Sequence, residues 1–218
     1  MARKSSLDLA LAGGLVGVAG MVTVSGLWSL YQRRTTETVP YTVVDRAGGF
    51  ELRRYPPTVL AETTADSDRK AFRRLFRYIG GENESAESVS MTTPVELGTR
   101  SQKISMTAPV ETASSDDGTV RMAFYLPQEH DLESAPQPTS EEVELVAAPE
   151  RLLAVRRFSG RRTDDRVTRE SERLLASLER AGLTAAREPF YMGYDAPWTL
   201  PFLRRNEVAT RVASGKSV

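Results

Sequence analysis

A pattern of 15 residues occurs twice in the chain, and it constrains the fold more than any other feature. Residues 50–64 (FELRRYPPTVLAETT) align without gaps with residues 143–157 (VELVAAPERLLAVRR). Both copies carry Glu-Leu at their second and third positions and a proline at their seventh. Each copy predicts a strand, a proline-containing turn and a second strand, and each is followed by a helical pattern. The repeat therefore predicts an α+β domain made of two pseudo-symmetric β-α-β halves.

The helical pattern after the first copy has one apolar stripe. Its apolar residues recur at i, i+3, i+4 and i+7: Phe72, Leu75, Phe76 and Ile79. This spacing predicts a helix over residues 66–79. Asp66 or Ser67 is suited to cap its start, and Gly80 with Gly81 is suited to end it.

The pattern after the second copy predicts a helix over residues 164–181. Its apolar residues share one face: Val167, Leu174, Leu175 and Leu178. Gly182 follows the last turn, in the position where a glycine commonly ends a helix.

Further strands are expected after each helix, at residues 88–97, 103–112, 119–126, 188–194 and 206–212. The link at residues 128–140 is rich in proline and serine and is expected to be a surface loop. Neither half alone buries enough apolar surface to be stable, so residues 40–213 are expected to form one domain.

The N-terminal part of the chain is apolar. Residues 9–30 (LALAGGLVGVAGMVTVSGLWSL) contain 22 residues without a charge. As a helix this segment is ~33 Å long, enough to cross the ~30 Å hydrocarbon core of a membrane. Basic and interfacial aromatic residues flank it: Arg3, Lys4, Trp28, Tyr31, Arg33 and Arg34. The segment predicts one transmembrane helix over residues 9–31.

The remaining boundaries follow from this anchor. Residues 1–8 are expected to be an N-terminal flank, residues 32–39 a polar tether, and residues 214–218 a disordered tail. A cleaved signal peptide is the alternative to the anchor, although no convincing cleavage site precedes the Arg33–Arg34 pair. Positive charge on both flanks leaves open the side of the membrane on which the domain lies.

Composition excludes several kinds of function. Lys and Arg together number 29 and so do Asp and Glu, so the formal net charge is zero and does not favour nucleic-acid binding. With no cysteine and one histidine, zinc sites built on Cys and His are excluded. No nucleotide-binding glycine motif or G-x-S-x-G nucleophile motif is present, so we expect no enzymatic activity.

Four motifs resemble those of the SOUL haem-binding family. They are FELRRYPPTVLAET at residues 50–63, RYIGGEN at residues 77–83, KISMTAPV at residues 103–110 and GYDAPWTLPFLRRNEV at residues 193–208. One departure is SVSMTTPVEL at residues 88–97, a near-duplicate of the third motif where some members have a single such strand. The resemblance implies that the two halves form a distorted antiparallel β-barrel with two flanking helices. It also implies binding of haem or related porphyrins in an open apolar groove beside the first helix, without enzymatic activity.

The first helix carries the residue types that such a groove needs. The resemblance places basic residues near the tetrapyrrole at Arg69 and Arg77. The helical spacing adds Arg73 to this row and sets Phe72 and Phe76 beside it, so these five residues are the expected site. The two phenylalanines suit the macrocycle, and arginine suits its propionates through two-pronged hydrogen bonding. The residues by themselves leave a second interpretation open, in which the apolar stripe is core and the arginines are solvated.

A strong iron ligand is not evident in the sequence. The only histidine, His130, is expected to be an exposed loop residue. The methionines of the predicted strands are expected to fill the core: Met91, Met106, Met122 and Met192. Tyr78 and Tyr194 are the remaining donor candidates. Any haem is therefore expected to be captured weakly, by apolar and electrostatic contacts.

Polar residues elsewhere are expected to be structural. The Arg-Arg-Asn-Glu run at residues 204–207 is expected to tie the last strand to the sheet by buried charge-assisted bonds, with propionate binding as the alternative. Edge or solvent-facing positions are expected for the carboxylates of the predicted strands and turns: Glu62, Glu96, Glu111, Glu144 and Asp195.

Two functions of different classes follow. The first is a single-pass, membrane-anchored haem- or porphyrin-binding protein that buffers or delivers its ligand. The alternative is a ligand-sensing or protein-interaction module of the effector-binding type that does not bind haem, because fold alone does not fix function.

Overall fold

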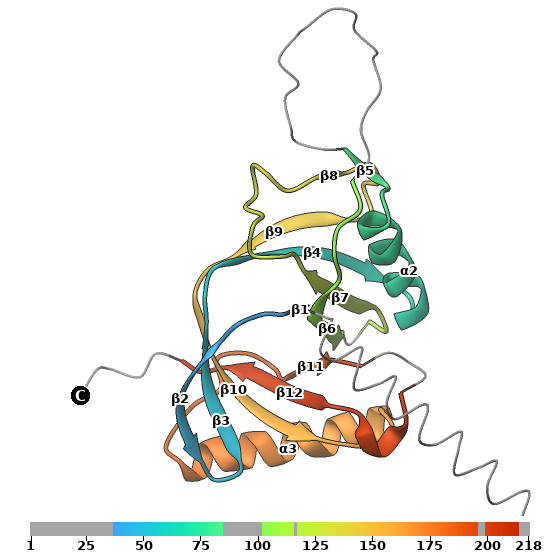
Figure 1. Ribbon diagram of the computed structural model, residues 1–218. Helices are drawn as coiled ribbons and strands as arrows, with labels where there is room; N and C mark the ends of the chain where they lie inside the picture. Colours follow the sequence, from blue (N-terminus) through green and yellow to red (C-terminus); the bar gives the residue numbers. More distant parts are fainter. Residues whose placement is uncertain (1–36, 85–101, 116, 196–198, 214–218) are drawn as a thin grey trace, which may run out of the picture.

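Two helices lie against one large sheet in the structure, a computed structural model that describes residues 37–84, 102–115, 117–195 and 199–213 (Figure 1). The α+β class is thereby confirmed. Among these residues no helix is long and apolar enough to span a membrane. The predicted anchor at residues 9–31, the predicted strand at 88–97 and the predicted tail at 214–218 lie outside the described residues.

Within the described residues the main sheet has ten strands, which pair in the order β2-β3-β10-β12-β11-β6-β7-β4-β9, with β1 beside β6. Its strands are β1 (Glu37–Thr38), β2 (Thr42–Ala47), β3 (Phe50–Tyr55), β4 (Thr58–Ala65), β6 (Thr107–Ser114), β7 (Val120–Tyr125), β9 (Glu144–Ala148), β10 (Arg151–Phe158), β11 (Phe190–Gly193) and β12 (Asn206–Arg211). All pairs are antiparallel except β1 with β6. The short strands β5 (Asn83–Glu84) and β8 (Gln137–Pro138) form a separate pair. Strand β1 pairs with β6 and Val39 is buried, so the last residues of the predicted tether at 32–39 pack with the sheet.

One long ladder joins the two halves of the sheet. Strand β3 continues into β4, and β9 continues into β10, so that each pair of strands runs through both halves (Figure 1). Tyr55 pairs with Arg151 on one side of the bend and Thr58 pairs with Ala148 on the other, which is the same register. Pro56 and Pro57 lie between β3 and β4, and Pro149 with Glu150 lies between β9 and β10. The prolines cannot donate to the ladder, and they favour a bend.

The expected distorted antiparallel β-barrel is wrong, because the sheet does not close into a barrel. The pairing order ends at β2 in one half and at β9 in the other, and these two edge strands do not pair with each other. The proline bends turn the two halves against each other, so the sheet wraps around its core without closing. The order strand, turn, strand, helix occurs in β3-β4-α2 and again in β9-β10-α3, whereas the internal repeat and the twofold symmetry of the halves stay predictions.

Helix α2 (Asp68–Ile79) begins two residues later than predicted and ends where expected. Ser67 is the N-cap residue, one of the two predicted positions, but its side chain makes no capping hydrogen bond. At the C-terminus, the backbone N–H of Gly80 donates to the carbonyl of Phe76 at 3.0 Å.

Helix α3 (Asp164–Arg180) ends one residue earlier than predicted, and Gly182 follows it with a φ of 71°, a conformation that favours glycine. Leu174 and Leu178 are buried under the sheet, whereas Leu175 is partly exposed.

Three apolar clusters form the core. One lies between α2 and the half that contains β4, β7 and β9, called the α2 half below. A second lies between α3 and β3, β10 and β12, called the α3 half. The third lies between the halves and includes Tyr55, Leu60, Leu153 and Met192. Most of the link at residues 128–140 is exposed, as expected for a surface loop, although Ala135 packs into the first cluster.

A buried ion-pair network fixes the end of β12. The Glu207 carboxylate is 0% exposed and accepts hydrogen bonds from Arg53 at 2.7 and 3.1 Å, from Arg205 at 2.9 Å and from the Tyr194 hydroxyl at 2.7 Å. Burial alone would lower the pKa of Arg53, but the Glu207 carboxylate raises it. In the same run, the Asn206 amide donates to the carbonyl of Gly160 at 2.9 Å. These bonds confirm the structural role expected for residues 204–207.

A second buried network corrects the expectation for Glu111. This residue is 2% exposed rather than solvent-facing, and it accepts hydrogen bonds from Tyr125 and, at 2.8 Å, from Arg151. Burial, followed by the charge of Glu111, raises the pKa of Tyr125 well above its usual range. The three residues come from β6, β7 and β10, so only the folded sheet brings them together.

Glu207→Gln tests how much the first network contributes to stability. The substitution keeps the shape but leaves Arg53 and Arg205 without their shared carboxylate, so we expect the free energy of unfolding to fall by about 3 kcal/mol. Denaturant unfolding measures this change. Glu150→Gln is the control, because Glu150 forms an exposed pair with Arg54, and its expected effect is below about 0.5 kcal/mol. Equal losses for the two variants would contradict this account of the network.

Candidate functional site

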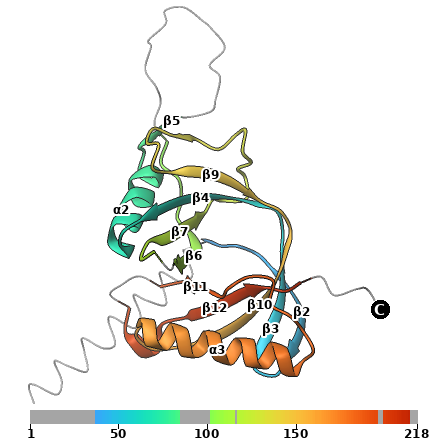
Figure 2. The same ribbon diagram turned by 180° about the vertical axis from the view of Figure 1, so that it is seen from behind.

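Helix α2 covers the sheet of the α2 half, where it packs against β4 and β7 (Figures 1 and 2). Its buried residues recur with helical spacing: Ala71, Leu75, Tyr78 and Ile79. They pack with Val59, Ala61 and Phe124 of the sheet. The predicted apolar stripe is therefore divided, because only Leu75 and Ile79 of its four residues belong to the core.

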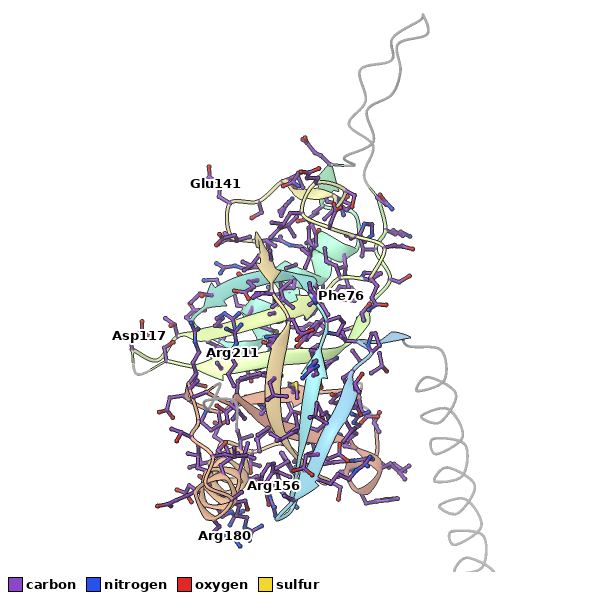
Figure 3. The ribbon with its side chains drawn as sticks, turned by 90° about the vertical axis from the view of Figure 1, so that its left-hand side faces the viewer. Phe76, Asp117, Glu141, Arg156, Arg180 and Arg211 are labelled. Atoms are coloured by element: carbon purple, nitrogen blue, oxygen red, sulfur yellow. The ribbon has the colours of Figure 1, made fainter. Side chains whose placement is uncertain are left out.

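Phe72 and Phe76, the other two residues of the stripe, lie at the edge of the helix–sheet contact. Phe72 is 36% exposed and Phe76 is 54% exposed. Their rings stack with centroids 5.8 Å apart and planes 17° apart. Phe72 also meets Phe124 of β7 edge-on, with centroids 5.4 Å apart, which connects the exposed pair to the core. The pair forms an apolar platform open to solvent, and Figure 3 labels Phe76 in this half of the molecule.

The three predicted arginines lie beside this platform. Arg69, Arg73 and Arg77 are exposed and follow one another at intervals of four residues, so they form a row along the helix. Arg69 and Arg73 are three residues before Phe72 and Phe76 respectively, which places each arginine next to a phenylalanine on the helix surface. Arg77 pairs with Glu82 at 3.3 Å. Within the part of the chain that the structure describes, Arg69 and Arg73 have no ion pair.

Other charged residues of α2 have structural partners instead. Arg74 donates to the carbonyl of Thr64 at 2.7 Å and also binds Glu142, which fastens the helix to the sheet. Asp68 binds Arg162, which precedes α3. The structure thus separates the arginines that hold α2 in place from those that remain open to a ligand.

The donor candidates for iron are mostly occupied. Tyr78 is buried and donates its hydroxyl to the carbonyl of Pro136 at 2.8 Å, and burial raises the pKa of Tyr78. Tyr194 donates to Glu207, and burial with that charge raises the pKa of Tyr194 well above its ordinary value. His130 lies in the loop after β7, but its side chain is 10% exposed, so the expected exposed histidine is wrong.

The methionines divide between core and surface. Met122 and Met192 are buried, as expected for core residues. Met106 is 37% exposed and precedes β6, so the expectation that it fills the core is wrong. Met91 lies outside the described residues. Within the described chain, no cluster of three or more His, Cys, Asp or Glu residues could hold a metal ion.

The structure brings all five predicted site residues to one face of α2, and it adds one that the sequence reasoning missed. Phe124 supports Phe72 from β7. Alternation in this strand was the available signal, because Met122 and Phe124 share the face that packs under α2. The predicted groove beside the helix stays a prediction. The two cavities described among these residues are lined by other elements.

Two curated relatives are similar to the chain over most of its length. "Heme-binding protein 2" of Mus musculus is 27% identical over 178 residues, which cover 78% of this chain and 80% of the mouse protein. "Heme-binding protein 2" of Homo sapiens is 27% identical over 168 residues, which cover 74% of this chain and 77% of the human protein.

Solved structures share the fold at low sequence identity. An uncharacterised conserved protein from Listeria innocua has a TM-score of 0.51 and 13% identity, over 77% of this chain and 94% of that one. The EcmrR C-terminal domain has a TM-score of 0.50 and 15% identity, over 80% and 99% respectively. At these identities the similarity establishes the fold alone.

The family described as SOUL heme-binding protein matches residues 36–211, which include every element of the main sheet and both helices. The match agrees with the motifs at both ends of the domain and with the two curated relatives. The chain belongs to the SOUL heme-binding protein family.

Proposed function

We propose that the chain is a membrane-anchored protein that binds haem or a related porphyrin on the outer face of α2. Family membership supports haem binding at the level of the family. In this proposal Phe72 and Phe76 contact the macrocycle, while Arg69, Arg73 and Arg77 bind its propionates. The bound ligand is buffered or passed on, and no enzymatic step is proposed.

One observation carries the proposal: a solvent-exposed pair of stacked phenylalanines lies beside a row of arginines. An exposed aromatic pair is unfavourable in water unless it serves a contact, and a flat macrocycle can cover both rings at once. The row of guanidinium groups supplies positive charge at the edge of the same surface, where the carboxylates of the ligand would lie. The residues present therefore fit the two chemical parts of a tetrapyrrole.

The proposed binding does not depend on a strong iron ligand. Apart from the buried Tyr78, helix α2 contains no His, Met, Cys or Tyr residue. Contacts of this kind recognise the macrocycle and its propionates rather than the metal, so they suit iron-free porphyrin as well as haem. Weak capture also suits buffering or delivery, because the ligand leaves without breaking a strong metal–protein bond.

Phe76→Ala and Arg73→Gln test this site in titrations of the purified chain with hemin and with protoporphyrin IX. We expect each variant to weaken both affinities about tenfold, because the loss of a ring contact or of a charge-assisted bond is worth about 1.4 kcal/mol. Both side chains are exposed, so the fold is expected to tolerate the changes. The absorption of the ligand and the quenching of protein fluorescence measure the binding.

Controls on α3 make this titration specific. Leu175→Ala removes a partly exposed apolar side chain, and Arg180→Gln removes an exposed arginine of the opposite half (Figure 3). Unchanged affinity is expected for both. Equal losses in the site and control variants would contradict the site.

A sharp low-spin six-coordinate hemin spectrum that disappears in His130→Ala would contradict binding without a strong ligand. A colourless chain that binds neither hemin nor protoporphyrin would favour the ligand-sensing alternative.

The membrane anchor rests on the sequence of residues 9–31, with 22 uncharged residues from Leu9 to Leu30. We expect the full chain to remain in the membrane fraction after alkaline carbonate extraction, and a chain that starts at Glu37 to be released. Immunoblots of the fractions, together with the mass of the mature chain, measure this. Release of the full chain, or a mass that shows cleavage near Arg33, would contradict the anchor and favour a signal peptide.

A further inference from the structure

A concavity of about 490 Å³ lies at the end of the β2–β3 hairpin, in the α3 half. Its polar lining comes from β2, β3, β10 and the segments just before β2 and β12: Tyr41, Arg46, Glu51, Arg53, Arg157 and Arg205. No residue of α2 contributes to it. Figure 3 shows this hairpin end beside the labelled Arg156, far from Phe76 in the other half. The volume lies in the range of pockets that bind small molecules.

The lining carries an excess of positive charge. Glu51 accepts hydrogen bonds from Arg46 at 3.0 Å and from Arg53 at 2.8 Å. Beneath the surface, the buried Glu207 is shared by Arg53 and Arg205. Two carboxylates therefore face four guanidinium groups, because Arg157 also lines the concavity.

In the part of the chain that the structure describes, Arg157 is the arginine of this lining that has no carboxylate partner. It is exposed, and within the described residues it has no hydrogen bond or ion pair from its side chain. Its partner across the ladder is Glu207, but that carboxylate is already occupied by Arg53, Arg205 and Tyr194. An anion in the concavity would relieve the repulsion between Arg157 and the neighbouring guanidinium groups.

The neighbouring donors are held in place before any ligand arrives. The Arg205 guanidinium lies over the Tyr194 ring at 3.7 Å and donates to the Tyr41 hydroxyl at 3.4 Å. The Arg53 guanidinium lies over the Tyr41 ring at 4.4 Å. Donors fixed in this way lose little conformational freedom on binding, which favours affinity for a matching ligand.

We infer that this concavity binds a small organic anion with a carboxylate or phosphate group, which Arg157 and Arg205 contact. The site is separate from the α2 face and does not depend on the function proposed for it. The geometry suits a small ligand held by its charged group, because the arginines cluster around one hollow rather than along an extended surface.

Calorimetric titration of the full chain in detergent with inorganic phosphate, succinate and the neutral analogue succinamide tests this inference. Saturable binding of phosphate, succinate or both is expected, with no binding of succinamide, and the two anions distinguish a phosphate ligand from a carboxylate ligand. Arg157→Gln is expected to weaken the binding at least about tenfold. Arg54→Gln is the matched control, because Arg54 is on β3 but does not line the concavity.

The inference is overturned if neither anion binds saturably, if succinamide binds as well as succinate, or if the two variants bind alike. Hemin affinity provides a further comparison. Arg157→Gln is expected to leave it unchanged. Loss of hemin affinity in Arg157→Gln but not in Arg73→Gln would show that the concavity is the tetrapyrrole site, and would overturn a separate anion site.

Discussion

The ladder that pairs β3 and β4 with β10 and β9 determines how the rest of the chain is arranged. Strands β3 and β4 pair with β10 and β9 in one register, which continues through the prolines at the bend. Side chains alternate between the faces of a strand, so a shift by one residue would exchange buried and exposed positions along the whole ladder. This register directs Leu52 and Ala154 toward α3, and Val59 and Ala61 toward α2.

The two candidate sites lie in opposite halves of the molecule, and both result from this arrangement of the strands. In the α2 half, the sheet is covered by a helix whose edge leaves Phe72 and Phe76 in solvent. In the α3 half, the end of the β2–β3 hairpin leaves a concavity around Arg157 and Arg205. The buried Glu207 network lies below that concavity and fixes two of its arginines, so stability and ligand recognition share the same residues there.

Much of the fold could be predicted from local sequence patterns. Hydrophobic periodicity and the glycine and proline positions predicted both strand–turn–strand segments, the helix after each, the end of α3 near Gly182 and the α+β class. The edge strand β2 was not predicted. Closure of the sheet could not be predicted, because it depends on whether β2 and β9 meet after the bends. The family motifs in the sequence did not contain that information.

The candidate site was predicted in composition but not in geometry. Helical spacing assigned Phe72, Leu75, Phe76 and Ile79 to one stripe, but it could not show how much of that stripe the sheet covers. The Glu111 network was missed for a related reason. Its partner Arg151 is 40 residues away, and no local pattern indicates that the sheet brings them together.

The central claim is that the tetrapyrrole lies on the outer face of α2, and paramagnetic broadening by hemin tests it most directly. Backbone amide signals of the isotope-labelled chain would be recorded in detergent while hemin is added. The account predicts that signals from Arg69 to Arg77 broaden first, while those of α3 and of the β2–β3 hairpin keep their intensity. Broadening centred on the hairpin or on α3, with the signals of α2 unchanged, would contradict it.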